Sequence, residues 1–288
     1  MNNTELTEKE FIKEFIAPYI NLKHTFPWLS HLHNGQAEDT ILGLSKEELS
    51  SLRELHTKLV KQAALELLKD DEITDLLEQL SFKGSETFLV LGDSNSLHPL
   101  SWFYILEEFL NIATERADFR FINSSVHQQT TSEALRMLDQ HVLAFEPDWV
   151  FVELGRFDIQ RLPFATDRTL LPLSETWENL NTIQEVLKSE ISNPLIWITP
   201  TPAITELLDE FPMYTYDLDS KDMAQVIQLV AGKEGVIIDP TGNRMGNNQP
   251  DAWNYLTDGI HHSVVGHTKT ARLIIERLAQ KDSQATGA

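Results

Sequence analysis

Two short segments, far apart in the sequence, combine a hydroxyl, an imidazole and a carboxylate that could act together. Residues 92–95 read Gly-Asp-Ser-Asn and follow the apolar run 88–91, with helical sequence resuming at about Leu97. Ser94 therefore stands at a strand-to-helix turn, where a hydroxyl can be exposed at the edge of a sheet beside backbone N–H groups that could bind an oxyanion. Alone, the Gly-Asp-Ser sequence is more often an ordinary turn.

The second segment lies near the C-terminus, just before a predicted helix. Asp258 precedes His261 by three residues, and His262 and His267 follow. This spacing lets the aspartate hold the far nitrogen of the imidazole and stabilise the cation that forms when His261 accepts a serine proton. Two alternatives remain open: a hydrogen-bonded surface histidine, or a metal site built on the three histidines, for which the chain offers no obvious companion cluster.

The elements that must position these residues follow a strand, turn and helix pattern, which predicts a parallel α/β sheet. Helical sequence at 100–113 and 264–278 would cover the sheet, and Thr130 with Glu133 forms a capping box between two strands. In such sheets, reactive groups gather where strands end. Two longer irregular stretches, 163–174 and 200–220, are candidate borders of a substrate cleft. The five predicted strands are residues 87–91, 119–122, 149–154, 195–199 and 236–238.

The first 84 residues differ from the rest, because they contain only helical patterns. The clearest helix begins at Ser45, where Glu48 completes a capping box, and its apolar stripe predicts packing on the main domain or on a second subunit. His24, His31 and His33 lie near the segment 26–28 (Phe-Pro-Trp) and could line a groove or simply pack within a loop. We predict a helical extension at 1–84, a catalytic-type domain at 85–282 and a disordered tail at 283–288.

Composition narrows the classes of partner. The chain has 288 residues, 41% of them hydrophobic, and a formal charge of 23 − 44 = −21. This charge would repel nucleic acid and anionic membranes but leaves neutral or cationic substrates open. The absence of cysteine excludes disulfides, thiolate metal sites and cysteine nucleophiles. No segment predicts a secretion signal or a membrane span, so we expect a soluble, cytoplasmic protein of undetermined oligomeric state.

Taken together, the motifs resemble those of the SGNH hydrolases, the GDSL family of esterases and lipases. Residues 92–95 resemble the nucleophile block of the family, and 258–261 its C-terminal Asp-x-x-His block. Residues 121–131, 152–158 and 195–202 resemble the intervening blocks, in family order. The resemblance implies a flavodoxin-like, three-layer α/β/α fold with a five-stranded parallel sheet and no metal or organic cofactor. It also implies hydrolysis of esters through an acyl-enzyme, with Ser94 as nucleophile, His261 as base and Asp258 orienting His261.

Two departures from the family concern the oxyanion hole. Gln128 stands where the family usually has glycine, and Phe157 where it usually has asparagine. The backbone N–H groups of Ser94 and Gln128 remain as candidate donors, and Asn95 or Arg156 could add a side-chain donor. Loss of one such donor typically lowers turnover by about 10²–10³. His262, where proline is frequent in the family, would alter loop stiffness more than chemistry.

The sequence therefore favours a carboxylic-ester hydrolase acting on small acyl esters, with esters of carbohydrates or other polar alcohols among its candidate substrates. A catalytically impaired binding or scaffold protein of the same fold is the first alternative, and Phe157 favours it. An acyltransferase using Ser94, His261 and Asp258 is the second alternative, because the same triad would serve both reactions.

Overall fold

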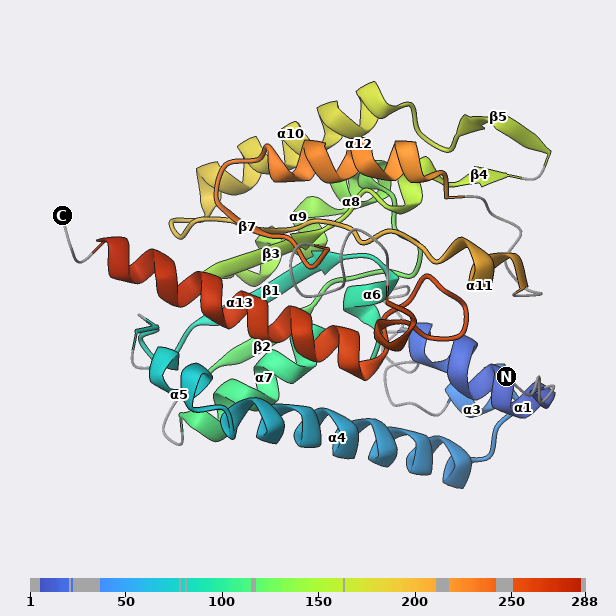
Figure 1. Cartoon of the computed structure of the whole chain (residues 1–288), viewed down its shortest axis with the longest axis horizontal. Helices are drawn as coiled ribbons and strands as arrows, with labels where there is room; N and C mark the ends of the chain where they lie inside the picture. Colours follow the sequence, from blue (N-terminus) through green and yellow to red (C-terminus); the bar gives the residue numbers. More distant parts are fainter. Residues whose placement is uncertain are drawn as a thin grey trace.

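The centre of the computed structural model is a five-stranded parallel sheet with the strand order β2-β1-β3-β6-β7 (Figure 1). Each observed boundary lies within one residue of the predicted boundary, and the predicted α/β class is confirmed. The short apolar runs form strands because both faces of the sheet are covered by helices, as parallel sheets require. The strands are β1 (Thr87–Gly92), β2 (Arg120–Asn123), β3 (Trp149–Glu153), β6 (Ile196–Ile198) and β7 (Val236–Ile238).

The structure describes residues 6–20, 22, 37–77, 79–80, 82–114, 118–162, 164–210, 218–241 and 251–285. The α-helices within these ranges are α1 (Glu8–Phe11), α3 (Glu38–Leu42), α4 (Lys46–Leu68), α5 (Asp71–Leu77), α6 (Ser94–Leu97), α7 (Trp102–Ala113), α8 (Thr131–Arg136), α9 (Leu138–His141), α10 (Leu173–Glu190), α11 (Thr205–Glu210), α12 (Ser220–Ala231) and α13 (Val264–Ala285). Shorter helical turns are η1 (Ile12–Ile16), η2 (Ala17–Tyr19), η4 (Leu143–Phe145), η5 (Phe157–Ile159) and η6 (Ala252–Asn254).

The side chains of β1 alternate between two separate cores. Phe88 and Val90 pack in the core that α7 and α13 cover, whereas Leu89 and Leu91 pack in the core that α8, α10 and α12 cover. Figure 1 shows these two helical layers on opposite sides of the sheet. This alternation is the period-two pattern of a strand buried on both faces. It fixes the register of β1 and therefore the point at which the strand delivers Ser94 to the edge of the sheet.

The helix α4 of the N-terminal extension packs against α7 and α13 of the same chain. Its buried face includes Val60, Ala64 and Leu67, which belong to the same hydrophobic core as Phe88 and Phe109. The apolar stripe predicted from the sequence thus packs on the main domain. In Figure 1, α4 runs along the outside of α7 and forms an additional layer on that side of the molecule.

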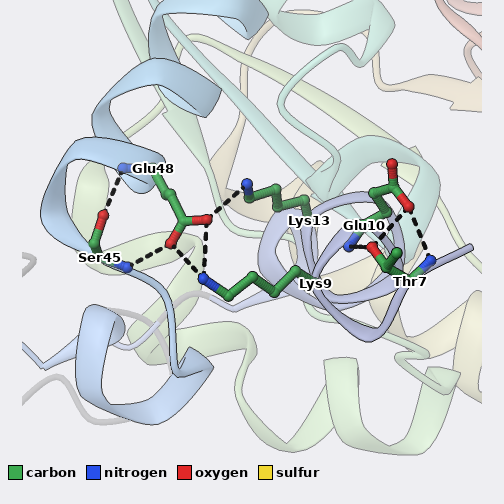
Figure 2. Close-up of polar contacts among 6 residues, drawn as sticks. All are labelled: Thr7, Lys9, Glu10, Lys13, Ser45 and Glu48. Atoms are coloured by element: carbon green, nitrogen blue, oxygen red, sulfur yellow. Dashed lines mark hydrogen bonds and ion pairs between the residues drawn. The ribbon is translucent and has the colours of Figure 1, made fainter.

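The first described residues form a small unit of their own against the start of α4 (Figure 2). Thr7 and Glu10 make a capping box for α1, and Ser45 and Glu48 make the predicted capping box for α4. The Glu48 carboxylate also receives Lys13 Nζ at 3.1 Å, and Lys9 Nζ lies 3.3 Å from the same oxygen. One carboxylate therefore caps α4 and joins it to the N-terminal segment. The apolar side of this contact is formed by Ile12, Ile16, Ala17 and Ile20 with Leu42, Leu44 and Leu49.

Several predictions differ from the structure. The stretch 163–174 contains β5 (Ala165–Thr169), which pairs with β4 (Arg161–Leu162), and 200–220 contains α11. The helix α13 continues to Ala285, three residues into the predicted disordered tail.

The candidate groove at His24, His31 and His33 lies outside the described residues. Over the described ranges, no helix combines the length and the apolar character needed to cross a bilayer.

Candidate active site

Ser94 lies where β1 ends and is the first residue of α6. Asp93 caps this short helix, with its Oδ1 accepting a hydrogen bond from Asn95 N–H at 2.9 Å. A Cβ at Gly92 would lie 2.7 Å from Ser96 Oγ, so the turn needs a residue without a side chain at this position. The Ser94 residue is fully buried, with 0% relative exposure. The tight turn thus presents the Ser94 hydroxyl to the loop that follows β2 rather than to solvent.

The loop after β2 supplies two contacts to the Ser94 hydroxyl. The Gln128 N–H donates a hydrogen bond to Ser94 Oγ at 2.8 Å, and His127 Nδ1 lies 3.0 Å from the same oxygen. Gln128 has a φ of 55°, in the left-handed region that favours glycine. A residue with a side chain therefore carries some strain at this position.

Asp258 and His261 form a buried hydrogen-bonded pair. Asp258 Oδ2 and His261 Nδ1 are 2.5 Å apart, and Asp258 Oδ1 accepts the N–H groups of Ile260 and His261, each at 3.0 Å. Burial opposes the charge of Asp258, but the His261 imidazole and these hydrogen bonds together hold the pKa of Asp258 below its ordinary value. Gly259 makes the tight turn with a φ of 71°, where a Cβ would lie 2.6 Å from Ile204 O. Asp258 is therefore a carboxylate that fixes one face of the His261 ring.

Direct hydrogen bonds join the Ser94 loop to the His261 loop. Asn95 Oδ1 accepts the N–H of His262 at 3.0 Å, so the residues next to Ser94 and His261 are bonded to each other. The ring of His127, which contacts Ser94, lies 6.2 Å from the ring of His261, with the two rings nearly parallel. The structure thus brings the predicted serine, histidine and aspartate into one cluster at the edge of the sheet.

Tyr19 of η2 covers this cluster. Its ring centroid lies 4.7 Å from that of His127 and 4.7 Å from that of His261. The Tyr19 residue is 6% exposed, and His261 is 1% exposed. The N-terminal extension therefore contributes an aromatic side chain to the candidate active site, about 75 positions before Ser94 in the sequence.

Solved structures with a similar fold share the arrangement of the sheet and its helices. A lipase/acylhydrolase from Enterococcus faecalis is 20% identical with a TM-score of 0.52, and the match covers 68% of this chain and 96% of that chain. An α/β hydrolase from the metagenome of Lake Arreo, Spain, is 19% identical with a TM-score of 0.54 and coverages of 68% and 96%. An acetylxylan esterase from Geobacillus stearothermophilus is 19% identical with a TM-score of 0.54 and coverages of 67% and 94%.

The chain has the α/β fold of the SGNH hydrolases. No protein-family model matches its sequence, and no curated protein matches it either. Structures of the Geobacillus acetylxylan esterase include catalytic mutants of a serine, an aspartate and a histidine, and that aspartate precedes that histidine by three residues. The three matches cover nearly the whole of each solved chain and leave about a third of this chain outside the shared SGNH fold.

Within the SGNH fold, the two departures at the candidate oxyanion-hole positions have different structural consequences. Gln128 keeps its backbone N–H directed at Ser94 Oγ, as described above. Phe157 is 1% exposed and packs in the hydrophobic core on the α8, α10 and α12 side of the sheet. A phenylalanine side chain has no hydrogen-bond donor, so position 157 offers only packing.

The two side chains considered as replacement donors each hold a loop in place. Arg156 is 1% exposed and donates from Nη1 to Ile260 O and from Nη2 to Thr201 Oγ1, each at 2.7 Å. The bond to Ile260 O holds the turn between Asp258 and His261 in place. Asn95 uses its Oδ1 to hold the His262 backbone. Arg156 is therefore a positioning residue for the histidine loop.

The other histidines near the site are buried and uncharged. Burial lowers the pKa of His98 to about 3, and burial holds the pKa values of His262 and His267 well below the ordinary value. His262 Nε2 lies 2.8 Å from Thr201 Oγ1, and the His267 ring packs 5.3 Å from that of His262. No group of three histidine or carboxylate side chains that could hold a metal ion occurs among the described residues.

Sequence reasoning missed two contributions to the site and gave a third residue a different role. Tyr19 gave no signal, because its contact is long-range and its segment carries no motif. His127 lies beside Gln128 within the block that resembles the family, and its titratable side chain next to an oxyanion-hole position was the available signal. Arg156 was considered for its charge, whereas its structural role depends on Thr201 and Ile260, which are distant in the sequence.

Proposed function

We propose that the chain is a serine-dependent carboxylic-ester hydrolase in which Ser94, His261 and Asp258 form the catalytic triad. The observation that carries the proposal is the buried Asp258–His261 pair on a loop that is hydrogen-bonded directly to the Ser94 loop. A neutral hydroxyl is a poor nucleophile until a positioned base removes its proton, and this arrangement supplies that base. The SGNH fold and the esterases among its solved relatives support the same reaction class.

In the acylation half-reaction, Ser94 Oγ attacks the carbonyl carbon of the ester while its proton passes to His261. Asp258 keeps the proton on His261 Nδ1, so that the other ring nitrogen is the base, and stabilises the imidazolium that forms. The C–O bond to the alcohol then breaks, and the alcohol leaves with the proton from His261. An acyl group remains on Ser94.

In the deacylation half-reaction, water replaces the alcohol. His261 accepts a proton from the water as its oxygen attacks the acyl carbon, and then returns that proton to Ser94 Oγ as the carboxylic acid leaves. Every step uses only groups of the chain and water. The backbone N–H groups of Ser94 and Gln128 are the proposed donors to the negatively charged oxygen in both halves.

Small acyl groups suit the proposal, because the reacting residues are buried and Tyr19 packs against two rings of the cluster. Acetyl esters of carbohydrates are a reasonable first panel, since one solved relative is an acetylxylan esterase. Transfer of the acyl group to another alcohol would use the same triad. Product analysis with added alcohol separates these reactions, because hydrolysis yields only free acid whereas transfer yields a new ester.

The direct test uses p-nitrophenyl acetate and butyrate with the wild type and Ser94→Ala. We expect turnover by the wild type and a loss of at least about 10³-fold in Ser94→Ala, because the hydroxyl is the nucleophile. Thermal unfolding of both proteins checks that the variant is folded. Full activity in Ser94→Ala would show that the nucleophile is another group. If the folded wild type neither turns over these esters nor reacts with a fluorophosphonate, the binding-protein alternative favoured by Phe157 would replace the proposal.

A further inference from the structure

The candidate oxyanion hole lacks a side-chain donor at the expected position. The tetrahedral intermediate of ester hydrolysis carries a full negative charge on oxygen, and donors directed at that oxygen usually contribute a large share of catalysis. Phe157 is buried in the core and cannot donate. The Arg156 guanidinium donates hydrogen bonds to Ile260 O and Thr201 Oγ1. The groups that already contact Ser94 Oγ are therefore the first candidates for a replacement donor.

His127 is such a group. Its Nδ1 lies 3.0 Å from Ser94 Oγ, next to the Gln128 N–H, which lies 2.8 Å from the same oxygen. We infer that His127 is a catalytic residue that donates a hydrogen bond from Nδ1–H to the oxyanion, replacing the side chain that Phe157 lacks. This inference rests on the proposed esterase function, because it assigns a role within that reaction.

The geometry supports a donor that moves from one oxygen to its neighbour. In the tetrahedral intermediate, Ser94 Oγ and the oxyanion are bonded to the same carbon. Donors that reach Oγ in the free protein can therefore reach the oxyanion after a small shift. The adjacent residues His127 and Gln128 would then provide a ring N–H and a backbone N–H from one loop.

Proton accounting assigns the tautomer of His127. Burial lowers the pKa of His127 to about 3, with the nearby His261 adding to the shift and Asp258 opposing it, so the ring is neutral and carries one N–H. The single proton of the Ser94 hydroxyl must point at His261 for attack. Ser94 Oγ can then only accept from Gln128 and from His127, which requires the proton of His127 on Nδ1.

The opposite assignment would make His127 the base. A base in this role needs a partner that stabilises its cation, as Asp258 does for His261. Within the described ranges, no hydrogen bond joins the His127 ring to a carboxylate, whereas Asp258 Oδ2 is 2.5 Å from His261 Nδ1. The structure therefore separates the two imidazoles into one base and one neutral donor.

The test compares His127→Ala with His127→Asn on p-nitrophenyl acetate. His127→Ala removes the donor, and we expect kcat to fall by about 10²–10³ with KM changed far less. Asparagine places an N–H donor at the δ position but has no basic nitrogen. The kcat of His127→Asn should therefore be at least about tenfold higher than that of His127→Ala, and its pH profile should keep the wild-type shape.

The inference is overturned if His127→Ala keeps wild-type kcat, or if folded His127→Asn is as inactive as His127→Ala. Nitrogen-15 NMR of the wild type gives a readout that does not depend on activity: a protonated Nδ1 on His127 agrees with the inference, and an unprotonated Nδ1 overturns it. Ser94→Ala distinguishes a failure of the His127 inference from a failure of the esterase proposal. If the wild type is active and Ser94→Ala is not, a negative result at His127 leaves the esterase proposal standing.

A second inference concerns the N-terminal segment and stands on different contacts. The turn η2 lies against α6, and Tyr19 packs on His127 and His261, so an ester has no open approach to Ser94 in this conformation. We infer that residues 8–20 form a cover over the site, which must move away to admit substrate. One of its attachments is the surface contact of Lys9 and Lys13 with Glu48 (Figure 2), and exposed ion pairs of this kind hold weakly.

Glu48→Gln tests the cover with a matched design. Glutamine can still serve the capping box with Ser45 but loses the attraction to Lys9 and Lys13, so α4 stays capped while the cover loosens. We expect kcat/KM for a bulky p-nitrophenyl ester to rise by about two- to fivefold over the wild type. Tyr19→Ala should speed labelling by a bulky fluorophosphonate.

Salt provides a control within the same experiment. Raising the ionic strength should increase the wild-type rate with the bulky ester more than the Glu48→Gln rate, because salt screens the same ion pairs. Unchanged rates in both Glu48→Gln and Tyr19→Ala would overturn the cover. A loss of kcat on the small acetate ester in Tyr19→Ala would also overturn it, since that result would assign Tyr19 to positioning His261.

Discussion

At the scale of single residues, the account depends on which nitrogen of which histidine holds a proton. Asp258 Oδ2 is hydrogen-bonded to His261 Nδ1, and Asp258 Oδ1 accepts two backbone N–H groups. Both carboxylate oxygens therefore have hydrogen-bond partners. His127 lacks such a partner within the described residues and stays neutral. Two neighbouring imidazoles can therefore have different tasks, which are set by their hydrogen-bond partners.

Asp258→Asn tests the role of that carboxylate. An asparagine oxygen can still accept the backbone N–H groups of Ile260 and His261, so the turn should persist, but the amide cannot stabilise the His261 cation. We expect kcat on p-nitrophenyl acetate to fall by about 10³–10⁴ while thermal unfolding changes little. A kcat within tenfold of the wild type would show that Asp258 has only a structural role.

The residues of the proposed triad could be named from the sequence because Ser94 and the Asp258-x-x-His261 segment carry local motifs. The φ of 55° at Gln128 and the contact of His127 with Ser94 could not, since both depend on how the loop after β2 folds back on β1. Phe157 was recognised as a departure from the family. Its consequence, burial in the core, required the structure.

At the scale of elements, the strands were predictable because each apolar run is short, β-rich and bounded by turn residues. The β4–β5 hairpin was missed, because most of β5 is exposed and lacks the alternation of apolar and polar residues that indicates a half-buried strand. The contact of η2 with α6 was missed for another reason. The two elements lie about 75 positions apart in the sequence, Tyr19 packs on His98 at the end of α6, and no local pattern encodes such a contact.

At the scale of the whole molecule, a buried carboxylate at the end of β3 links stability to pH. Burial, followed by the nearby Asp93, raises the pKa of Glu153 from 4.5 to about 7, although Ser96 and Trp102 donate hydrogen bonds to it. The folded state therefore keeps the proton of Glu153 at pH values where the unfolded state has released it. By linkage, the free energy of unfolding decreases as pH rises from about 4.5 to about 7.

Glu153→Gln should remove this part of the pH dependence. The glutamine oxygen can accept from Ser96 and Trp102 without carrying a charge. We expect the variant to be more stable than the wild type at pH 8, by up to about 3 kcal/mol, and to show a smaller difference at pH 4.5. Urea unfolding at both pH values measures this, and two parallel stability profiles would contradict the shift at Glu153.

The location of a covalent label tests the central claim most directly. A small fluorophosphonate should react with the wild type, and mass spectrometry of the digested protein should find the label on Ser94. Folded His261→Ala should label at least about 10³-fold more slowly, since the serine loses its base. Label on a residue other than Ser94, or an unchanged labelling rate in His261→Ala, would contradict the account.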